Sequence, residues 1–444
     1  MRDWSPIELY LGGCGVRRRL LMVLLLLPVS TYAEPLSDLA RRGRSVMIDH
    51  ECNRCHDVSD VSGRGLGIAP AEEEIHCVRC HTTILGTRGN EALIQEKSAS
   101  FPLWRQYLEN IVHLTALPDL GSLTRRVDPV FIRQFLASPF DLRPNLPESM
   151  IPVPLTEKEK DSIVRYLFEL NGQSSVKYGA ASWADISPSA VEKGRKVFVS
   201  RGCPTCHLVG NEKLVNGFDR AFYRYASPVA KLAPNLRYVR QRIPRHRLVD
   251  FVVNPKAVDP KTAMPQQIVS RPEAEAIADF LGGAELVLPP LPTEPEVGVP
   301  VMERPVTFAE VKQRVFQKVC VHCHMNAEAN EGLGGPGNTG GLGFEGVGLD
   351  LETIEGIRAG LLRNGRRISI LRPSGKHRQA LLVEVLIQRR REALRDQRLP
   401  YGEYAQRGRT RRGQQPGMPL GLPALSLADI SLVKSWIEQG APGD

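Results

Sequence analysis

Cys52-Asn-Arg-Cys55-His56 is the first of four C-x-x-C-H motifs, and the expected architecture of the chain follows from this repetition. The second, third and fourth copies hold Cys77, Cys80 and His81, then Cys203, Cys206 and His207, then Cys320, Cys323 and His324. In this pattern the two thiols lie about one helical turn apart and can form thioethers with the vinyl groups of a haem, while the following His ligates the iron. The sequence therefore predicts four covalently bound haem c groups.

Two other interpretations of these motifs were weighed. A single C-x-x-C-H could be a thioredoxin-like redox pair, but fourfold repetition with the same His argues against it. The pairs Cys52/Cys55 and Cys77/Cys80 are spaced nearly like the halves of a four-cysteine zinc ribbon. Zinc would leave the two later cysteine pairs far apart and would not explain a His after every pair. Haem attachment is therefore favoured.

The start of the chain predicts export. Three arginines (17–19) precede an apolar run over 20–29, and Thr31-Tyr32-Ala33 offers a small-residue cleavage site. We expect a signal peptide over 1–33 and a periplasmic mature chain, with no transmembrane segment because the apolar run is too short to span a bilayer. Cleavage would remove Cys14, so every remaining cysteine lies in a C-x-x-C-H motif and none is left for a structural disulfide.

Composition and charge fit a globular protein that binds anionic groups. The chain is 42% hydrophobic and 24% charged, within the usual range of globular domains. Its formal net charge is +9, and removal of the predicted signal peptide lowers this to about +7. The propionates of four haems would offset nearly all of it. The excess Arg and Lys are therefore expected to be propionate partners and solvated surface, with no nucleic-acid partner.

Internal repeats predict the domain organisation. Gly43 to Ile48 precedes Cys52 in the same register in which Gly194 to Val199 precedes Cys203, and each stretch predicts a short helix. Each copy also closes with a Met near a Pro, followed by a capped amphipathic helix. The three closing segments hold Met150, Thr156 and Glu159, then Met264, Ser270 and Glu273, and then Met418, Ser426 and Asp429.

These repeats divide the mature chain into three domains of ordinary size. We expect a dihaem domain over 34–172, a monohaem domain over 188–283, a Pro-rich linker over 284–305 and a monohaem domain over 306–444. The second motif lacks the preceding helix and is expected to be an insertion into the first domain.

Together these features resemble the class I cytochrome c family: an opening helix, C-x-x-C-H, a Pro-Asp/Asn-Leu turn, a Met-Pro loop and a closing helix. The turn occurs at Pro118-Asp119-Leu120 and at Pro234-Asn235-Leu236. The last domain resembles planctomycete-type cytochrome domains, with Gly348-Leu349-Asp350-Leu351 and Trp436 to Pro442. The resemblance implies a mainly α fold of three tandem cytochrome c-like domains with covalent haems.

The resemblance also implies thioether sixth ligands at three irons, and the matching residues are Met150, Met264 and Met418, with Met150 assigned to the His56 haem. Ordinary core packing is the alternative for each Met. For the Cys77/Cys80 haem we expect His113 as sixth ligand, with His50 and His76 as alternatives. His113 lies near the end of an expected helix whose apolar residues would form a haem wall. These apolar residues are Trp104, Leu108, Ile111 and Val112.

The expected function is electron relay between redox partner proteins by a periplasmic tetrahaem cytochrome of the respiratory chain. Two alternatives stay open. One is a haem enzyme of peroxidase or reductase type with an open axial site at the Cys77/Cys80 haem, although no catalytic residue is predicted. The other is a cytochrome subunit of a membrane oxidoreductase complex, in which the Arg-dense stretch 389–412 would steer an acidic or membrane-bound partner, unless that stretch is only a solvated loop.

Overall fold

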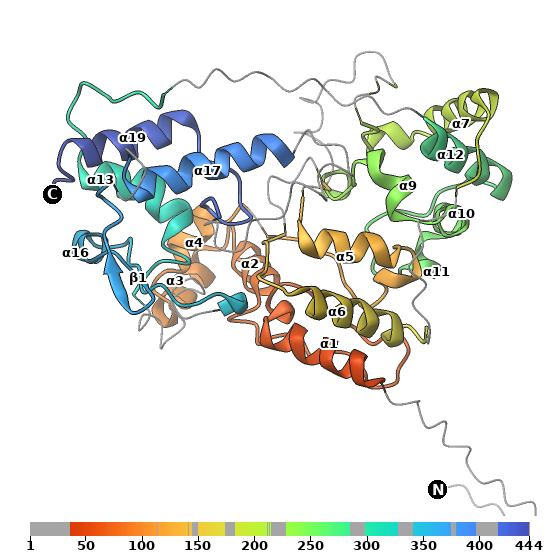
Figure 1. Cartoon of the computed structure of the whole chain (residues 1–444), viewed down its shortest axis with the longest axis horizontal. Coiled ribbons are helices and arrows are strands. Elements are labelled where there is room, and N and C mark those ends of the chain that lie inside the picture. The colour runs from red at the N-terminus through yellow and green to blue at the C-terminus, as the bar shows by residue number, and fades with distance from the viewer. Residues whose placement is uncertain are drawn as a thin grey trace, which may run out of the picture. The chain divides into compact units, whose positions relative to one another are not determined.

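The computed structural model is mainly helical, with 52% of residues in helices and 3% in strands, so the predicted mainly α class is confirmed (Figure 1). It describes residues 36–112, 114–140, 142–143, 150–173, 183–210, 212, 214, 228–284, 298–326, 341–373, 379–396 and 416–443. The predicted signal peptide and His113 lie outside these residues. Among the described helices, none is both long enough and apolar enough to cross a bilayer.

Two helices pack closely in the N-terminal region, residues 36–173. They are α1 (Asp38–Asp49) and α6 (Glu157–Leu170). A Cβ on Gly43 would lie 1.9 Å from the carbonyl oxygen of Ser162, so the crossing requires glycine. Glycine in a helix interior destabilises the helix by about 1 kcal/mol relative to alanine. The close approach of the two backbones explains why a glycine is nevertheless found here. The shorter elements are η1 (Cys52–Arg54), η2 (Leu123–Arg125) and α5 (Pro129–Ala137).

Between η1 and η2 the chain forms three helices around a small core of their own. They are α2 (Cys77–Gly86), α3 (Glu91–Ser100) and α4 (Trp104–Asn110). Their core consists of Ile84, Ile94, Leu108 and Ile111, with Trp104 packed against it. The expected helix is shorter than predicted, because α4 ends at Asn110 and the backbone becomes extended at Ile111, so Val112 lies beyond the helix and is 67% exposed.

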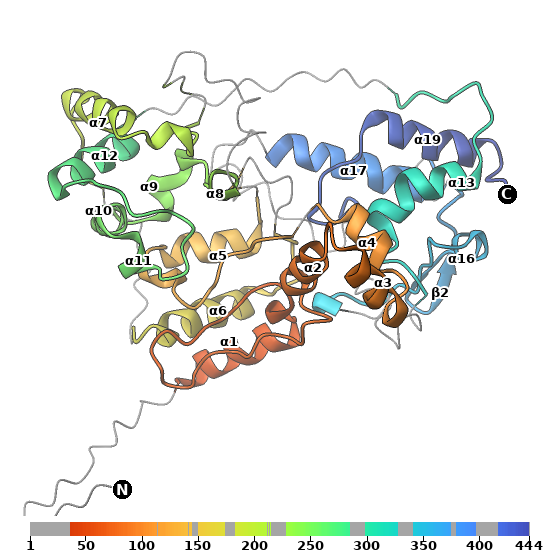
Figure 2. The same ribbon diagram turned by 180° about the vertical axis from the view of Figure 1, so that it is seen from behind.

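The central region, residues 183–284, repeats the crossing of the N-terminal region. Helices α7 (Pro188–Ser200) and α12 (Arg271–Gly283) lie side by side in Figure 1 and Figure 2. A Cβ on Gly194 would lie 1.9 Å from the carbonyl oxygen of Ala276. The shorter elements are η3 (Cys203–Thr205), α8 (Pro228–Lys231), η5 (Leu236–Tyr238), α9 (Val239–Arg242), α10 (Arg245–Val253) and α11 (Pro255–Val258).

The C-terminal region, residues 298–443, opens with a different helix. Helix α13 (Phe308–Val311) continues directly into a π-helix, η6 (Lys312–Cys320), and both pack against α19 (Leu427–Glu438). The other elements are η7 (Gly341–Gly343), α16 (Ile354–Ala359), α17 (Leu381–Asp396) and a hairpin of β1 (Leu361–Arg363) and β2 (Arg366–Ile368), in which Leu361 lies opposite Ile368.

Part of the Arg-dense stretch 389–412 belongs to α17, so its first residues are helical and not the solvated loop that stood as one alternative for the stretch. Arg389 is buried, and its Nε donates a hydrogen bond of 2.8 Å to the carbonyl oxygen of Leu422. This arginine is therefore committed to the interior of the region. The part of the stretch beyond Asp396 lies outside the described residues.

The three closing helices share one design, and their predicted caps are confirmed. Thr156 and Ser270 form capping boxes with Glu159 and Glu273, and Ser426 accepts a hydrogen bond from the amide of Asp429. Ten residues after its N-cap, each helix places a fully buried aromatic side chain in the core. These residues are Tyr166, Phe280 and Trp436.

Candidate functional site

The first and third C-x-x-C-H motifs have the same backbone. After α1 the chain turns through Glu51 in a left-handed conformation, with φ of 51°, and enters the 3₁₀ turn at Cys52. After α7 it turns through Gly202, with φ of 72°, and enters the equivalent turn at Cys203. In both motifs a single left-handed residue therefore ends the preceding helix and places the cysteine pair directly after it.

The histidines of these two motifs are held in the same way. Nδ1 of His56 donates a hydrogen bond of 2.9 Å to the carbonyl oxygen of Pro118, and Nδ1 of His207 donates one of 3.0 Å to that of Pro234. A carbonyl can only accept, so Nδ1 carries the proton and Nε2 keeps its lone pair. Burial lowers the pKa of both histidines, which favours the neutral ring. Each imidazole is thus prepared to ligate a metal through Nε2.

A second hydrogen bond closes the turn against the motif in all three regions. The amide of Leu120 donates to the carbonyl of Asp57, and the amide of Leu236 donates to that of Leu208, each over 2.8 Å. In the C-terminal region, the amide of Leu351 donates over 2.8 Å to the carbonyl of His324. The acceptor there is the histidine itself and not the residue after it, so the third copy keeps the contact with its register shifted by one residue.

The second motif differs because it begins a helix. Cys77 is the first residue of α2, and His76 is its N-cap, with Nδ1 accepting a hydrogen bond of 3.3 Å from the amide of Arg79. His76 is buried at 2% exposure, and its Nε2 lies 3.7 Å from Oδ1 of Asp57. This Nε2 has no hydrogen-bond partner among the described residues, so His76 stays an alternative prediction for the sixth ligand.

Of the other two histidines proposed as sixth ligands, His50 and His113, the structure describes only His50. Nε2 of His50 lies 3.9 Å from Oε1 of Glu159, and its ring packs against Gly343, where a Cβ would lie 2.0 Å from Nδ1. His50 therefore bridges α6 and the C-terminal region. His113 lies outside the described residues.

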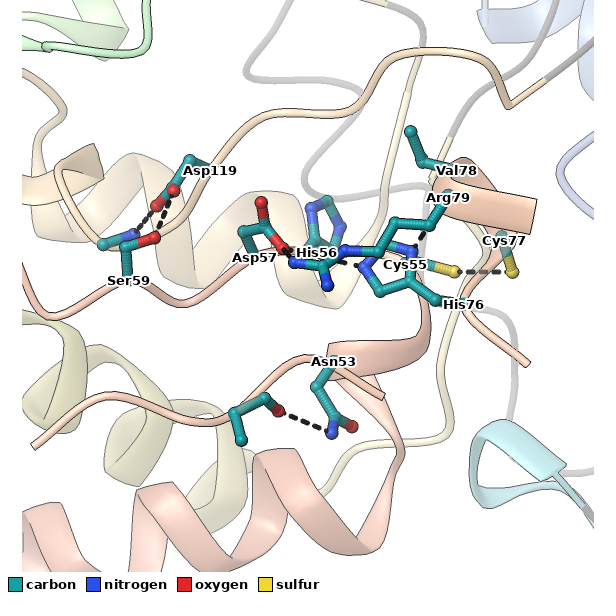
Figure 3. A network of polar contacts seen from close by, with 12 residues as sticks. Asn53, Cys55, His56, Asp57, Ser59, His76, Cys77, Val78, Arg79 and Asp119 are labelled. Atoms are coloured by element: carbon teal, nitrogen blue, oxygen red, sulfur yellow. Dashed lines mark hydrogen bonds and ion pairs between the residues drawn. The ribbon is translucent and has the colours of Figure 1, made fainter. Parts of the chain in front are cut away.

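The fold brings the first two motifs into contact. Sγ of Cys55 lies 3.5 Å from Sγ of Cys77 (Figure 3). That separation alone would also suit two thiolates on one zinc ion, since Zn–S bonds are about 2.3 Å and tetrahedral. However, no group of three or more His, Cys, Asp or Glu side chains converges as a metal site among the described residues.

The second motif also touches the fourth, on its other side. The ring centroids of His81 and His322 are 6.1 Å apart. A hydrogen bond of 3.1 Å joins Nδ1 of His322 to the hydroxyl of Tyr107, whose ring lies 5.3 Å from that of His322. Sequence reasoning missed Tyr107, since no local pattern links α4 to a motif more than two hundred residues away.

An ion-paired lysine links the central region to the first motif. Nζ of Lys261 lies 2.6 Å from a carboxylate oxygen of Asp119 and 3.5 Å from one of Asp57. Lys261 precedes Met264 by three residues, so the Met264 loop is fastened beside His56.

Most motif thiols are in environments that keep them protonated. Burial raises the pKa of Cys52 and Cys203 to about 11 and that of Cys320 to about 12. Thiols of this kind are poor nucleophiles and do not match the low pKa values of thioredoxin-like pairs. The exception is Cys77, whose pKa is lowered because it accepts a hydrogen bond from Cys55.

The three candidate methionine ligands are all half-buried. The amide of Met264 donates over 3.2 Å to Oγ1 of Thr262, and that of Met418 donates over 2.9 Å to the carbonyl of Val385. Met418 packs against the C-terminal core, which is the alternative role weighed for it. Met150 begins the described segment that leads into α6. Their role as ligands remains a prediction.

Comparison with other proteins adds no relative. No family model, no curated protein and no solved structure matches the chain.

Proposed function

We propose that the chain is a periplasmic tetrahaem c-type cytochrome of three cytochrome c-like domains, which relays electrons between redox partner proteins. The observation that carries the proposal is the matched pair of hydrogen bonds from His56 to Pro118 and from His207 to Pro234. Each histidine follows a C-x-x-C pair, and each presents a neutral Nε2. That combination is what covalent attachment plus axial ligation of a haem needs.

The residues present fit the group. Eight cysteines would form the thioethers, and His56, His81, His207 and His324 would ligate the irons. The guanidinium of Arg242 is buried with no hydrogen-bond partner for its Nε, so the interior already holds positive charge suited to an anionic group such as a propionate. The haem would supply reversible one-electron oxidation of iron. The chain would supply attachment, axial ligands and electrostatic surroundings.

Contacts between motifs favour electron relay between haems and argue against four independent sites. Cys55 touches Cys77, and His81 lies beside His322, so the second motif adjoins both the first and the fourth. These side chains would carry or flank neighbouring haems. A chain that only stored electrons would not need them together.

The first experiment counts haems. The protein is produced in a host that matures c-type cytochromes, and its mass, pyridine haemochrome spectrum and zinc content are measured. We expect the polypeptide plus four haems, with no stoichiometric zinc. A colourless product with the bare polypeptide mass would refute the proposal, and zinc bound at Cys52, Cys55, Cys77 and Cys80 would replace it for that part of the chain.

The second experiment tests the methionine ligands. Met150→Ala, Met264→Ala and Met418→Ala are made singly, and the Met-to-iron charge-transfer absorption is recorded. Each is expected to remove one haem's share of the band and to lower that haem's potential, because a neutral thioether favours ferrous iron. Met302→Ala is the control, since Met302 is a half-buried methionine of the C-terminal region with no proposed ligand role. An unchanged band excludes that residue.

The third experiment separates a carrier from an enzyme. Carbon monoxide and cyanide are added to the reduced and oxidised holoprotein, and low-temperature spectra report the spin state. A pure carrier should show four low-spin irons and no ligand binding. One high-spin iron that binds both would favour the peroxidase or reductase alternative at the Cys77/Cys80 haem. The salt dependence of electron transfer to acidic partners tests the subunit alternative.

A further inference from the structure

Three arginines come together where the N-terminal and central regions pack. Arg126 follows η2, Arg242 ends α9, and Arg143 lies on the segment after α5. Two backbone hydrogen bonds fix this junction: the amide of Asp128 donates over 2.8 Å to the carbonyl of Arg242, and the amide of Asn235 donates over 2.9 Å to that of Leu142. Each arginine therefore sits beside a bond that joins the two regions.

Two of these arginines are buried with too few partners. Arg242 is 7% exposed, its Nε has no hydrogen-bond partner, and among the residues that the structure describes no carboxylate forms an ion pair with it. The Nε of Arg126 is also without a partner, although its Nη2 lies 3.3 Å from Oδ2 of Asp259. Asp259 is shared with Ser122, whose hydroxyl donates to it over 2.8 Å.

Burial of an uncompensated guanidinium is unfavourable unless an anion pairs with it. Burial and repulsion from Arg126 and Arg143 lower the pKa of Arg242 to about 9, the direction that an uncompensated buried cation gives. The junction thus gathers like charges in a buried place, and among the described residues the single carboxylate that pairs with Arg126 does not balance both Arg126 and Arg242. An anionic group from outside the polypeptide would.

The cluster lies between two of the proposed haem sites. Asn235, whose amide donates to the carbonyl of Leu142, follows Pro234, the proline that holds His207. Nη1 of Arg143 also donates over 3.4 Å to the carbonyl of Ala116, two residues before the proline that holds His56. The cluster is therefore within reach of the first and third motifs together.

We propose that Arg126, Arg143 and Arg242 form one carboxylate-binding site, shared by the N-terminal and central regions, that takes propionate groups of the haems attached at Cys52 and Cys203. This inference rests on the proposed haem function. The guanidinium fork suits a carboxylate through two parallel hydrogen bonds. Haem attachment at the two motifs then consolidates the contact between the regions, and the cationic site raises both potentials by favouring reduced, less positive iron.

The test compares Arg242→Gln with Arg240→Gln in the holoprotein. Arg240 lies on the same helix, is exposed, and among the described residues donates only to the carbonyl of Gly282, over 3.2 Å. Arg242→Gln should lower the midpoint potentials of the first and third haems, leave the second and fourth unchanged, and speed protease cleavage between the two regions. Arg240→Gln should match the unaltered protein, and Arg242→Lys should keep more of the potential than Arg242→Gln does. Unchanged potentials in Arg242→Gln would overturn the inference.

A second measurement needs no variant. Redox difference infrared spectra are recorded on holoprotein whose haem propionates carry ¹³C carboxyls, as the medium is acidified. Some labelled bands should stay ionised well below the ordinary pKa of a solvated carboxylic acid, because the arginines hold the charge. If all labelled carboxyls titrate as solvated acids, the shared site is refuted while the haem proposal stands. Failure to incorporate haem at all would refute the proposed function itself.

Discussion

The N-terminal and central helix pairs differ from the C-terminal pair in how they fill the same crossing. Gly43 and Gly194 bring the backbones of α1 and α7 against the closing helices, whereas the corresponding residue nine positions before the fourth motif is Val311, fully buried. Across from it, Leu432 replaces the small residues Ser162 and Ala276. One architecture is thus reached either by close contact of backbones or by larger side chains.

The opening helices differ in geometry as well as in these residues. In the C-terminal region the opening helix runs as a π-helix into Cys320, where the other two regions have a left-handed residue and a 3₁₀ turn. A π-helix has a wider turn than an α-helix, so the same nine residues before the motif follow a different path. In all three regions the helix that leads into the C-x-x-C-H motif packs against the closing helix, although its geometry differs in the C-terminal region.

The largest effect should come from Trp436, which fills the space that the C-terminal crossing leaves open. Trp436→Ala removes the side chain that packs on Phe308 and Phe316 and donates from its indole to the carbonyl of Pro442. We expect a loss of about 4 kcal/mol in free energy of unfolding, since a buried Trp leaves a large cavity. Urea unfolding measures it, with Trp436→Phe as the milder control. A loss below about 1 kcal/mol would show that other residues fill this crossing.

Next come the two glycines, which should behave alike. Gly43→Ala and Gly194→Ala would each place a Cβ 1.9 Å from a backbone carbonyl oxygen, so the helices must separate. We expect a loss of about 3 kcal/mol for each, the upper end of the usual cost of overpacking. The control is Gly86→Ala at the end of α2, where a Cβ meets open space. Thermal unfolding checks all three, and tolerance of alanine at either crossing would break the comparison.

The smallest effect concerns the capping boxes of α6 and α12. The pKa of Glu159 is lowered because the backbone amide and the hydroxyl of Thr156 hydrogen-bond to its carboxylate. A carboxyl group whose pKa is lower in the folded than in the unfolded state stabilises the folded protein at pH values above the unfolded-state pKa. This stabilisation is lost as the pH falls through the folded-state pKa. Thr156→Ala removes the hydroxyl bond and keeps the amide bond, so it should cost about 1 kcal/mol at neutral pH and reduce the loss on acidification in part.

Ser270→Ala sharpens the same test. A hydrogen bond from Arg201 is the main reason that the pKa of Glu273 lies at about 2, and this bond survives the substitution. The Ser270 variant should therefore keep more of its acid sensitivity than the Thr156 variant. Acid titrations of stability on both variants measure this difference. Equal loss of acid sensitivity in the two would show that the caps alone hold both carboxylates.

Local patterns were enough to predict the helical elements of the site. The caps at Thr156, Ser270 and Ser426 and the buried faces after them were expected correctly, because capping and helical periodicity depend on residues within a few positions. The same reasoning did not predict the end of α4 at Asn110 or the burial of Arg389. Where a helix ends, and whether a charged residue stays in solvent, depends on packing that distant segments provide.

Local residue patterns were sufficient to identify the four C-x-x-C-H motifs, their opening and closing helices, and the Pro-Asp/Asn-Leu turns. Only the tertiary structure decided that Pro118 and Pro234 accept hydrogen bonds from the motif histidines, that Cys55 meets Cys77, and that Arg126, Arg143 and Arg242 meet at one junction. The physical reason is range. Attachment and capping are set by adjacent residues, whereas tautomer, motif contact and buried charge are set by groups that only folding brings together.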